Sequence, residues 1–239
     1  MPRWAKAVAA LILVACVVVV GRQVSRSETY QLFGDLISRV DTAEPVVALT
    51  FDDGPTARHT PAVLQALADS GITATFYVNG LPASKEQETL ADIVKAGHEI
   101  GNHAWHHNRM VLRPPWRVRR EIADTDNAIR AAGYDGPITF RPPYGAKLIV
   151  LPWVLSQMER ATVMWDVAPE DWDHLDEPPA DLAARTISAT RPGSIIILHP
   201  MFDSGGATRA AIPLIVAGLQ AKGYRFVTVG ELLALGPDS

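Results

Sequence analysis

The sequence lacks a second cysteine and, beyond residue 26, has a deficit of positive charge. A single cysteine excludes an intrachain disulfide and a cysteine-ligated zinc site. Residues 1–26 hold four basic side chains and no acid. The rest of the 239-residue chain holds 18 basic and 26 acidic side chains, a net charge of −8. An acidic surface repels phosphate backbones, so we expect no nucleic acid among the partners.

Two common signatures are also missing, although the chain has the composition of a folded domain. No G-x-G-x-x-G follows the first predicted strand, which disfavours a dinucleotide site. No G-x-S-x-G elbow is present, which disfavours a serine hydrolase. The apolar fraction of 48% is sufficient for a packed core and excludes a disordered or collagen-like chain.

The first 26 residues have the pattern of a targeting segment. Residues 7–21 are uncharged and mostly apolar, and basic residues flank them, as in a secretory signal. This run is short for a membrane span, which usually needs about 20 residues. We expect residues 1–26 to be a cleaved signal peptide or a retained membrane anchor. The catalytic part is then exported, either secreted or held on the outer face of the cytoplasmic membrane. Lipidation at Cys16 is a third alternative, which the four valines after it do not favour.

Beyond residue 45, short branched runs alternate with amphipathic stretches. This alternation predicts parallel strands connected by helices, and seven strands are most simply closed as an α/β barrel. An open doubly wound sheet is the alternative. Residues 27–45 are expected to form a stalk, with a short helix around residues 30–38. The predicted strands are 46–51, 74–78, 99–102, 138–141, 162–167, 194–198 and 225–229, and the predicted helices are 60–70, 83–96, 115–132, 147–158, 178–190 and 208–222.

Polar clusters follow five of the predicted strands, at the point where each strand ends. In a closed α/β barrel the carboxyl ends of all strands face one rim, where active sites are built. We therefore expect the five clusters to converge on one pocket. They are 50–55 (Thr-Phe-Asp-Asp-Gly-Pro), 101–107 (Gly-Asn-His-Ala-Trp-His-His), 141–145 (Arg-Pro-Pro-Tyr-Gly), 166–172 (Asp-Val-Ala-Pro-Glu-Asp-Trp) and 198–199 (Leu-His).

Two histidines and a pair of aspartates have the spacing of a metal site. His103 and His107 are four residues apart, so on a helical turn both imidazoles lie on one face and can bind one ion. Asp52 and Asp53 are adjacent, so their side chains must diverge. One can then bind the metal while the other reaches the substrate. Two imidazoles and one carboxylate leave coordination positions open, which is typical of a catalytic ion.

Arg141 and His199 supply further charged groups at this rim. A guanidinium beside a carboxylate lowers the pKa of the carboxyl group and orients it, which suits a base that must be ionised at neutral pH. His199 follows the apolar run 195–198 of a predicted buried strand, a position suited to a general acid.

The same histidines and carboxylates are compatible with other classes of protein. Two histidines and a carboxylate also form the iron site of non-haem oxygenases, although those enzymes are typically jelly rolls. Two carboxylates such as Asp52 and Asp171 could serve a glycosidase, but the histidine pair would then have no role. A glycan-binding protein on a retired catalytic scaffold is the non-enzymatic alternative.

Taken in order, the five clusters resemble the motifs of the polysaccharide deacetylase family, the NodB-homology domains of carbohydrate esterase family 4. T-F-D-D-G-P resembles the first motif, H-A-W-H-H the second, R-P-P-Y-G the third, E-D-W the end of the fourth and I-L-H the fifth. The resemblance covers residues 46–235. It implies one domain with a distorted (β/α) barrel of about seven parallel strands.

The resemblance implies roles for the matching metal and base residues. Asp53, His103 and His107 would hold a divalent ion, most often zinc. Asp52 would be the general base, and Arg141 would be its tether.

The resemblance also implies roles for the general acid and for the residues that bind the acetyl group. His199 would be the general acid, and Asp171 would orient the arginine tether. The backbone N–H of Tyr144 would help to bind the oxyanion. Ile197 and Trp172 would line the acetyl pocket.

Three positions depart from the family pattern. Ala168 stands where an acid is usual, so Asp166 is expected to take the place of that acid. Ala104 replaces the usual Ser or Thr of the second motif, and Pro200 follows the fifth motif where Asp is common. No expected metal ligand, base or acid is lost.

The function that the resemblance implies is the removal of N-acetyl groups from a glycan containing N-acetylglucosamine, with release of acetate. Peptidoglycan or a chitin oligomer is the expected substrate, and the membrane is a partner through residues 7–21 if these are kept. The alternatives are a deformylase of a lipid-linked amino sugar and a catalytically retired glycan-binding protein.

Overall fold

Strand β2 (Val46–Asp52) lies at the centre of the fold, and all seven of its residues are buried. The computed structural model describes residues 2–236. β2 pairs in parallel with β3 (Thr75–Val78), β6 (Ile195–Leu198) and β7 (Arg225–Val227), and β3 pairs with β4 (Glu99–Asn102). Unbroken runs of branched and aromatic residues suit such strands, because both of their faces are buried.

The sheet curls into a distorted barrel whose wall is only partly made of regular strands. β5 (Thr162–Val163) pairs in parallel with β1 (Leu36–Ile37). Single bridges continue the wall, since Phe140 bridges both β4 and β5 and Val167 bridges β6. The expected distorted parallel barrel is therefore present, but regular strands of the described residues do not close it, since only the single bridges at Phe140 and Val167 complete the wall.

Two predicted strands are shorter in the structure. The strand predicted at 138–141 is reduced to the single bridging residue Phe140, because Pro142 and Pro143 have no N–H to continue a ladder. The strand predicted at 162–167 is regular over two residues and touches the sheet again at Val167.

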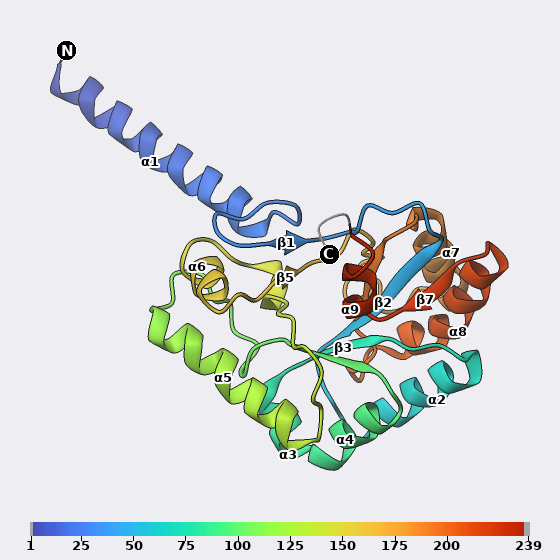
Figure 1. Cartoon of the computed structure of the whole chain (residues 1–239). Helices are drawn as coiled ribbons and strands as arrows, with labels where there is room; N and C mark the ends of the chain where they lie inside the picture. Colours follow the sequence, from blue (N-terminus) through green and yellow to red (C-terminus); the bar gives the residue numbers. More distant parts are fainter. Residues whose placement is uncertain (1, 237–239) are drawn as a thin grey trace.

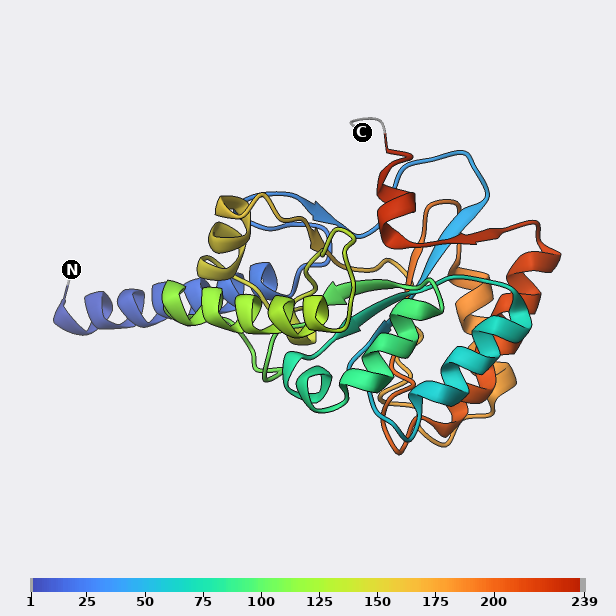
Figure 2. The same cartoon turned by 60° about the horizontal axis from the view of Figure 1, so that its bottom comes forward.

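Helices connect the strands and cover the outside of the barrel (Figure 2). The helix predicted at 83–96 is divided in two, because Glu86 has a non-helical backbone with φ −110° and ψ 46°. A short 3₁₀ turn, η1 (Pro143–Gly145), follows the Phe140 bridge. The α-helices around the barrel are α2 (Thr60–Ser70), α3 (Gly80–Lys85), α4 (Gln87–Lys95), α5 (Pro115–Ala131), α6 (Val150–Gln157), α7 (Pro179–Ala189), α8 (Gly206–Ala221) and α9 (Val229–Leu233).

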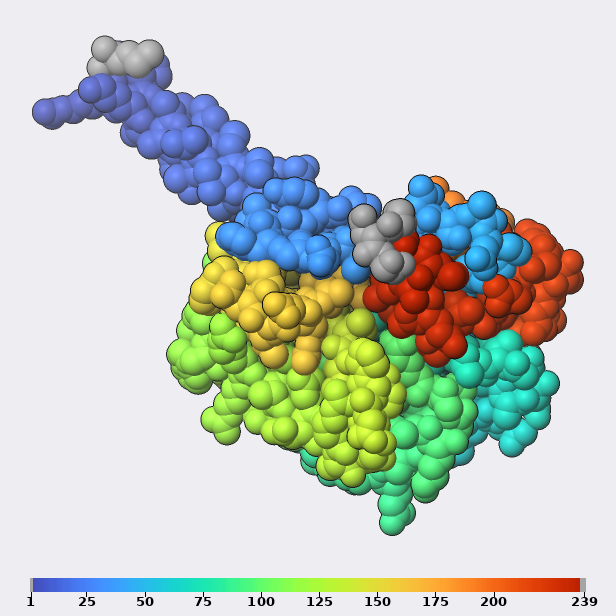
Figure 3. Space-filling view, viewed as in Figure 1, coloured from blue at the N-terminus to red at the C-terminus, as the bar shows by residue number. Residues whose placement is uncertain are grey.

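The chain begins with helix α1 (Arg3–Arg26), which projects from the barrel (Figure 1). This 24-residue helix contains an 18-residue window with a mean hydropathy of 2.4, so it is long and apolar enough to cross a membrane by length and composition. Residues 27–45, expected to form a stalk, lie on the body beside α1 (Figure 3). The short helix expected around 30–38 is absent from this described segment, where β1 pairs with β5 instead.

The end of α1 is fixed to the barrel by a buried lysine. The Lys147 backbone N–H donates to the carbonyl oxygen of Ser25 at 2.9 Å, and its ammonium group donates to the carbonyl oxygen of Ser27. Burial lowers the pKa of Lys147 to about 8, although the nearby Glu28 carboxylate opposes this shift. The end of the helix is therefore bound directly to the barrel.

Gly193 fixes the segment after β1 against the start of β6. Its φ is +77°, and a Cβ at this position would overlap the backbone oxygen of Val40. We expect Gly193→Ala to lower the free energy of unfolding by roughly 2–4 kcal/mol, because left-handed strain and the clash add together. Gly133→Ala is the matched control, since its φ of +89° brings the strain without a neighbour within 4 Å. Urea unfolding gives the free energy of unfolding of both variants. An equal decrease in the two would contradict the expected clash with Val40.

Candidate active site

The polar clusters of the strand ends meet in one groove at the carboxyl rim of the barrel. Eight of the ten site residues expected from the sequence line this groove, and the other two, Arg141 and Asp171, are buried behind it. The expected residues in the lining are Asp52, Asp53, His103, His107, Tyr144, Trp172, Ile197 and His199.

Three of these side chains could hold one metal ion. The ligand atoms that Asp53, His103 and His107 offer all lie within 4.8 Å of one another. Asp53 Oδ1 is 3.3 Å from His107 Nε2 and 4.0 Å from His103 Nε2. Two imidazoles and one carboxylate would leave positions open for water and substrate.

The two histidines converge for a different reason from the one we expected. Residues 103–107 form a loop and not a helical turn, and Ala104 and His107 have left-handed backbones with φ of 64° and 55°. Asp53 is also left-handed, with φ 73°. A non-glycine residue rarely adopts this conformation, so the surrounding structure holds the ligands in a strained arrangement.

The protonation of the histidines fits metal binding. His103 Nδ1 lies 2.8 Å from the backbone oxygen of Arg141, to which it donates, so Nε2 is left as the free ligand atom. Burial, together with the charge of His103, lowers the pKa of His107 and favours the neutral form that a metal requires.

Asp52 is held in its ionised form by a buried arginine. Asp52 Oδ1 accepts a hydrogen bond from Arg141 Nη1 at 2.6 Å, and the guanidinium is fully buried. Arg141 also donates to Thr50 Oγ1 and to the carbonyl oxygens of Val163 and Met164. Burial alone would raise the pKa of Asp52, but the charges of Arg141 and of neighbouring histidines hold it below its ordinary value.

The partner that we expected for Asp171 is wrong. Asp171 accepts hydrogen bonds from the His199 backbone N–H at 2.6 Å, from His199 Nδ1 at 3.0 Å and from Thr208 Oγ1 at 3.1 Å. No hydrogen bond links it to Arg141 within residues 2–236. Its loop lies against the end of β6 and the start of α8, so its carboxylate orients the general acid and not the tether of the base.

Asp166 does not take the place of the missing acid either. Its carboxylate accepts from Ser194 Oγ at 3.0 Å and from the Ile195 backbone N–H at 2.9 Å, and it pairs with Arg191. It therefore fastens the start of β6, away from the Asp52 carboxylate.

His199 is poised to carry a proton. Burial by itself would lower its pKa, but the hydrogen bond to Asp171 and the charges of Asp171, Asp52 and Asp53 raise the pKa above the ordinary value. A raised pKa favours the protonated form, and a histidine that faces the groove in this form suits a general acid.

Aromatic and apolar residues form the walls of the groove. Tyr144 has a left-handed backbone with φ 58°, and its ring centroid lies 4.6 Å from that of His107. Trp172 presents its ring to His199 edge-on at 4.9 Å between centroids. Ile197, 1% exposed, contributes an apolar side chain to the lining.

Several further lining residues were not expected from the sequence, and four of them are polar or aromatic groups close to the site. Arg26 and Glu28 come from the end of α1 and the segment after it, which we interpreted as a leader and a stalk. Arg109 places its guanidinium carbon 4.3 Å from the centroid of the Tyr144 ring. Trp165 is nearly buried, and its indole N–H approaches Glu28 without a hydrogen bond of good geometry. No sequence pattern marks these residues as part of a site.

Comparison with known proteins relates the chain to enzymes that act on glycans. A family model described as polysaccharide deacetylase matches residues 39–163, just over half of the chain. The chain is 33% identical over 193 residues to the peptidoglycan-N-acetylmuramic acid deacetylase PdaC of Bacillus subtilis, which covers 81% of this chain and 40% of that protein. It is 30% identical over 194 residues to a peptidoglycan-N-acetylglucosamine deacetylase of Bacillus cereus, covering 81% and 91%. The chain thus spans about two fifths of the length of the first of these relatives.

Solved structures share the fold. The peptidoglycan deacetylase PdaC from Bacillus subtilis superposes with a TM-score of 0.72 at 33% identity, over 82% of this chain and 93% of that chain. A pseudoenzyme of carbohydrate esterase family 4 from Bacillus anthracis superposes with a TM-score of 0.76 at 26% identity, over 84% and 69%.

The three candidate ligands can be tested by metal content alone. We expect Asp53→Ala and His107→Ala to lose most of the bound metal, because each removes one of three ligands. His106→Ala is the matched control, since His106 Nδ1 bonds to Glu121 at 2.8 Å and lies outside the candidate triad. Mass spectrometry of dialysed protein gives the metal per chain, and a full equivalent in Asp53→Ala would overturn the ligand set.

Proposed function

The chain belongs to the polysaccharide deacetylase family, and from this premise we propose that it is a metal-dependent hydrolase that removes N-acetyl groups from a glycan. The glycan contains N-acetylglucosamine, and peptidoglycan or a chitin oligomer is the substrate in this proposal. The observation that carries it is one groove that brings a possible metal site together with two charged pairs. These pairs are Asp52 with Arg141, and His199 with Asp171.

The two pairs divide the acid and base work of amide hydrolysis. A divalent ion at Asp53, His103 and His107, zinc in this proposal, would polarise the acetyl carbonyl and acidify water. Asp52, which is ionised, takes a proton from the water that attacks the carbonyl carbon. His199, whose raised pKa favours its protonated form, gives its proton to the amine nitrogen as the C–N bond breaks. Acetate and a free amino sugar are the products.

The walls of the groove position the acetyl group for this attack. The backbone N–H of Tyr144 makes no hydrogen bond to another described residue, so it is free to donate to the developing oxyanion. Ile197 and Trp172 offer apolar surface to the methyl group. Arg141 keeps the base in one orientation, and Asp171 does the same for the acid.

The groups present here favour an active enzyme over a retired scaffold. One structural relative is described as a pseudoenzyme, so the fold alone does not decide the point. In this chain each group that the mechanism uses is present, and eight of them line one groove.

We also propose that α1 is kept as a membrane anchor on the exported protein. A cleaved leader would remove groups that the barrel uses, because Ser25 is 7% exposed and Arg26 lines the groove. The relatives named for peptidoglycan support an extracellular glycan substrate. The catalytic body then works outside the cytoplasmic membrane, beside the bilayer.

The test is acetate release by the full chain in detergent from purified peptidoglycan and from acetylated glucosamine oligomers. We expect a chelator to stop the release and zinc to restore it. Asp52→Asn should keep its metal and lose at least about 10²-fold in kcat, because its amide cannot accept the proton. Metal-loaded protein that releases no acetate from either glycan would contradict the proposal.

The pH profile separates the acid from the base. Activity should rise through the lowered pKa of Asp52 and fall through the raised pKa of His199, because the base must be ionised and the acid protonated. Asp171→Asn removes a charge that raises the pKa of His199, so the alkaline limb of kcat/KM should move to lower pH. An alkaline limb that stays in place would show that His199 does not supply the proton.

A further inference from the structure

A strongly basic surface lies beside the groove, around the start of α5. Residues 109–120 contain five arginines and no acid, in a chain that is otherwise acidic beyond residue 26. We call this region the arginine surface. It comprises Arg109, Arg113, Arg117, Arg119 and Arg120, with the apolar residues Leu112 and Trp116 between them.

Most of this positive charge is not neutralised within the chain. Arg120 pairs with Asp124 at 3.4 Å, and among residues 2–236 the other four arginines form no ion pair. Arg109 and Arg119 lie over aromatic rings, which leaves their charge in place. Like charges at close range repel, so an anion from outside the chain would stabilise this arrangement.

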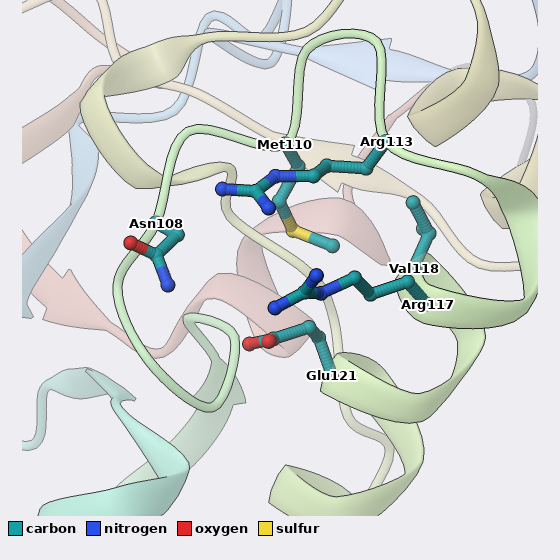
Figure 4. A pocket seen from close by; sticks show the side chains of 6 residues that line it. All are labelled: Asn108, Met110, Arg113, Arg117, Val118 and Glu121. Carbon is teal, nitrogen blue, oxygen red and sulfur yellow. The ribbon is translucent and has the colours of Figure 1, made fainter.

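Two arginines of this surface extend across a small depression. The Arg113 and Arg117 side chains extend in the same direction, with the Met110 side chain between them and Asn108 at the far edge (Figure 4). Guanidinium groups match the oxygens of a phosphate in geometry as well as charge. The Glu121 carboxylate also lines the depression, and it already accepts from His106 Nδ1 at 2.8 Å and the His106 backbone N–H at 3.0 Å.

Exposed apolar side chains within the arginine surface favour a lipid over a soluble anion as its ligand. Leu112 is 76% exposed and Trp116 is 66% exposed, although both lie among charged residues. Leucine and tryptophan beside arginine are typical of surfaces that enter the interface of a bilayer.

The arginine surface faces the side on which a membrane would lie. In two views the N-terminal end of α5 and helix α6 lie on the side of the barrel from which α1 projects (Figures 1 and 2). The apolar run 7–21 spans about 22 Å as a helix, less than the roughly 30 Å of a hydrocarbon core. A short span draws the end of α1 into the interface, and Lys147 ties that end to the barrel.

We propose that the arginine surface binds the headgroups of anionic phospholipids in the bilayer that holds α1. This contact keeps the mouth of the catalytic groove at the membrane surface, because Arg109 belongs both to the arginine surface and to the groove lining. The proposal rests on the retention of α1 and is independent of the chemistry in the groove.

The experiment measures the depth of a spin label at Leu112→Cys on the full chain, with Cys16→Ser removing the native thiol. The chain is placed in nanodiscs of phosphatidylcholine alone or with phosphatidylglycerol. With phosphatidylglycerol we expect the label to lose contact with a water-soluble relaxing agent and to gain contact with oxygen dissolved in the lipid. A label at Ala68→Cys, exposed on α2 away from α1, should stay in water in both.

Charge reversal shows whether the arginines cause this contact. Arg117→Glu, Arg119→Glu and Arg120→Glu together should return the label at 112 to water. Lys85→Glu, Lys95→Glu and Lys222→Glu together carry the same change in net charge at the ends of other helices and should leave the label in the lipid.

The outcomes separate this proposal from those on which it builds. If the label at residue 112 is as accessible to the water-soluble agent as the label at residue 68 in anionic nanodiscs, lipid binding by the arginine surface is overturned. Acetate release from peptidoglycan fragments can also be measured in detergent. If reversal of the three arginines lowers this release and leaves the depth of the label unchanged, the arginine surface binds the glycan, and lipid binding is overturned too. A chain that does not co-elute with nanodiscs would refute the anchor itself, whereas loss of acetate release alone would bear on the proposed chemistry.

Discussion

The buried ion pair between Arg141 and Asp52 is the constraint on which the site depends. The guanidinium lies within the barrel, 4.0 Å from the centroid of the Tyr77 ring, and donates to Asp52, Thr50 and two backbone carbonyls. A buried charge is tolerated only when its hydrogen bonds are satisfied, and removal of one partner typically costs about 3–5 kcal/mol. The pair therefore fixes β2, the segment after Phe140 and the chain beyond β5 in one arrangement.

The same arginine connects the base to the candidate metal site. Its side chain orients Asp52, while its backbone oxygen accepts the Nδ1 proton of His103 and so fixes which nitrogen faces Asp53. On the opposite wall, Asp171 orients His199 through a separate set of hydrogen bonds. The base and the metal ligands thus form one unit and the acid another, and substrate would lie between them.

The sequence was sufficient to predict the barrel and the convergence of the site. Buried strands have unbroken apolar runs, and the rule that strand ends share a rim placed Asp52, His103 and His199 together. The left-handed backbones of Ala104 and His107 could not be predicted, because tertiary packing imposes them against local preference.

Contacts between loops could not be predicted from the sequence either. Spacing along the chain does not tell which loop packs on which, and the family resemblance implied the arginine as the partner of Asp171, whereas Asp171 contacts His199. Residues after the apolar run were interpreted as a leader and a stalk by composition, yet Arg26 and Glu28 line the groove. A composition that predicts targeting says nothing about a second role in the folded protein.

X-ray absorption at the zinc edge on the loaded full chain tests the central claim most directly. The account predicts two imidazole nitrogens at about 2.0–2.1 Å, with further oxygen ligands from Asp53 and solvent and no sulfur. Replacement of His103 should leave one imidazole in the first shell. A zinc site with three imidazole ligands would contradict the proposed ligand set. A spectrum that does not change when His103 is replaced would contradict it as well.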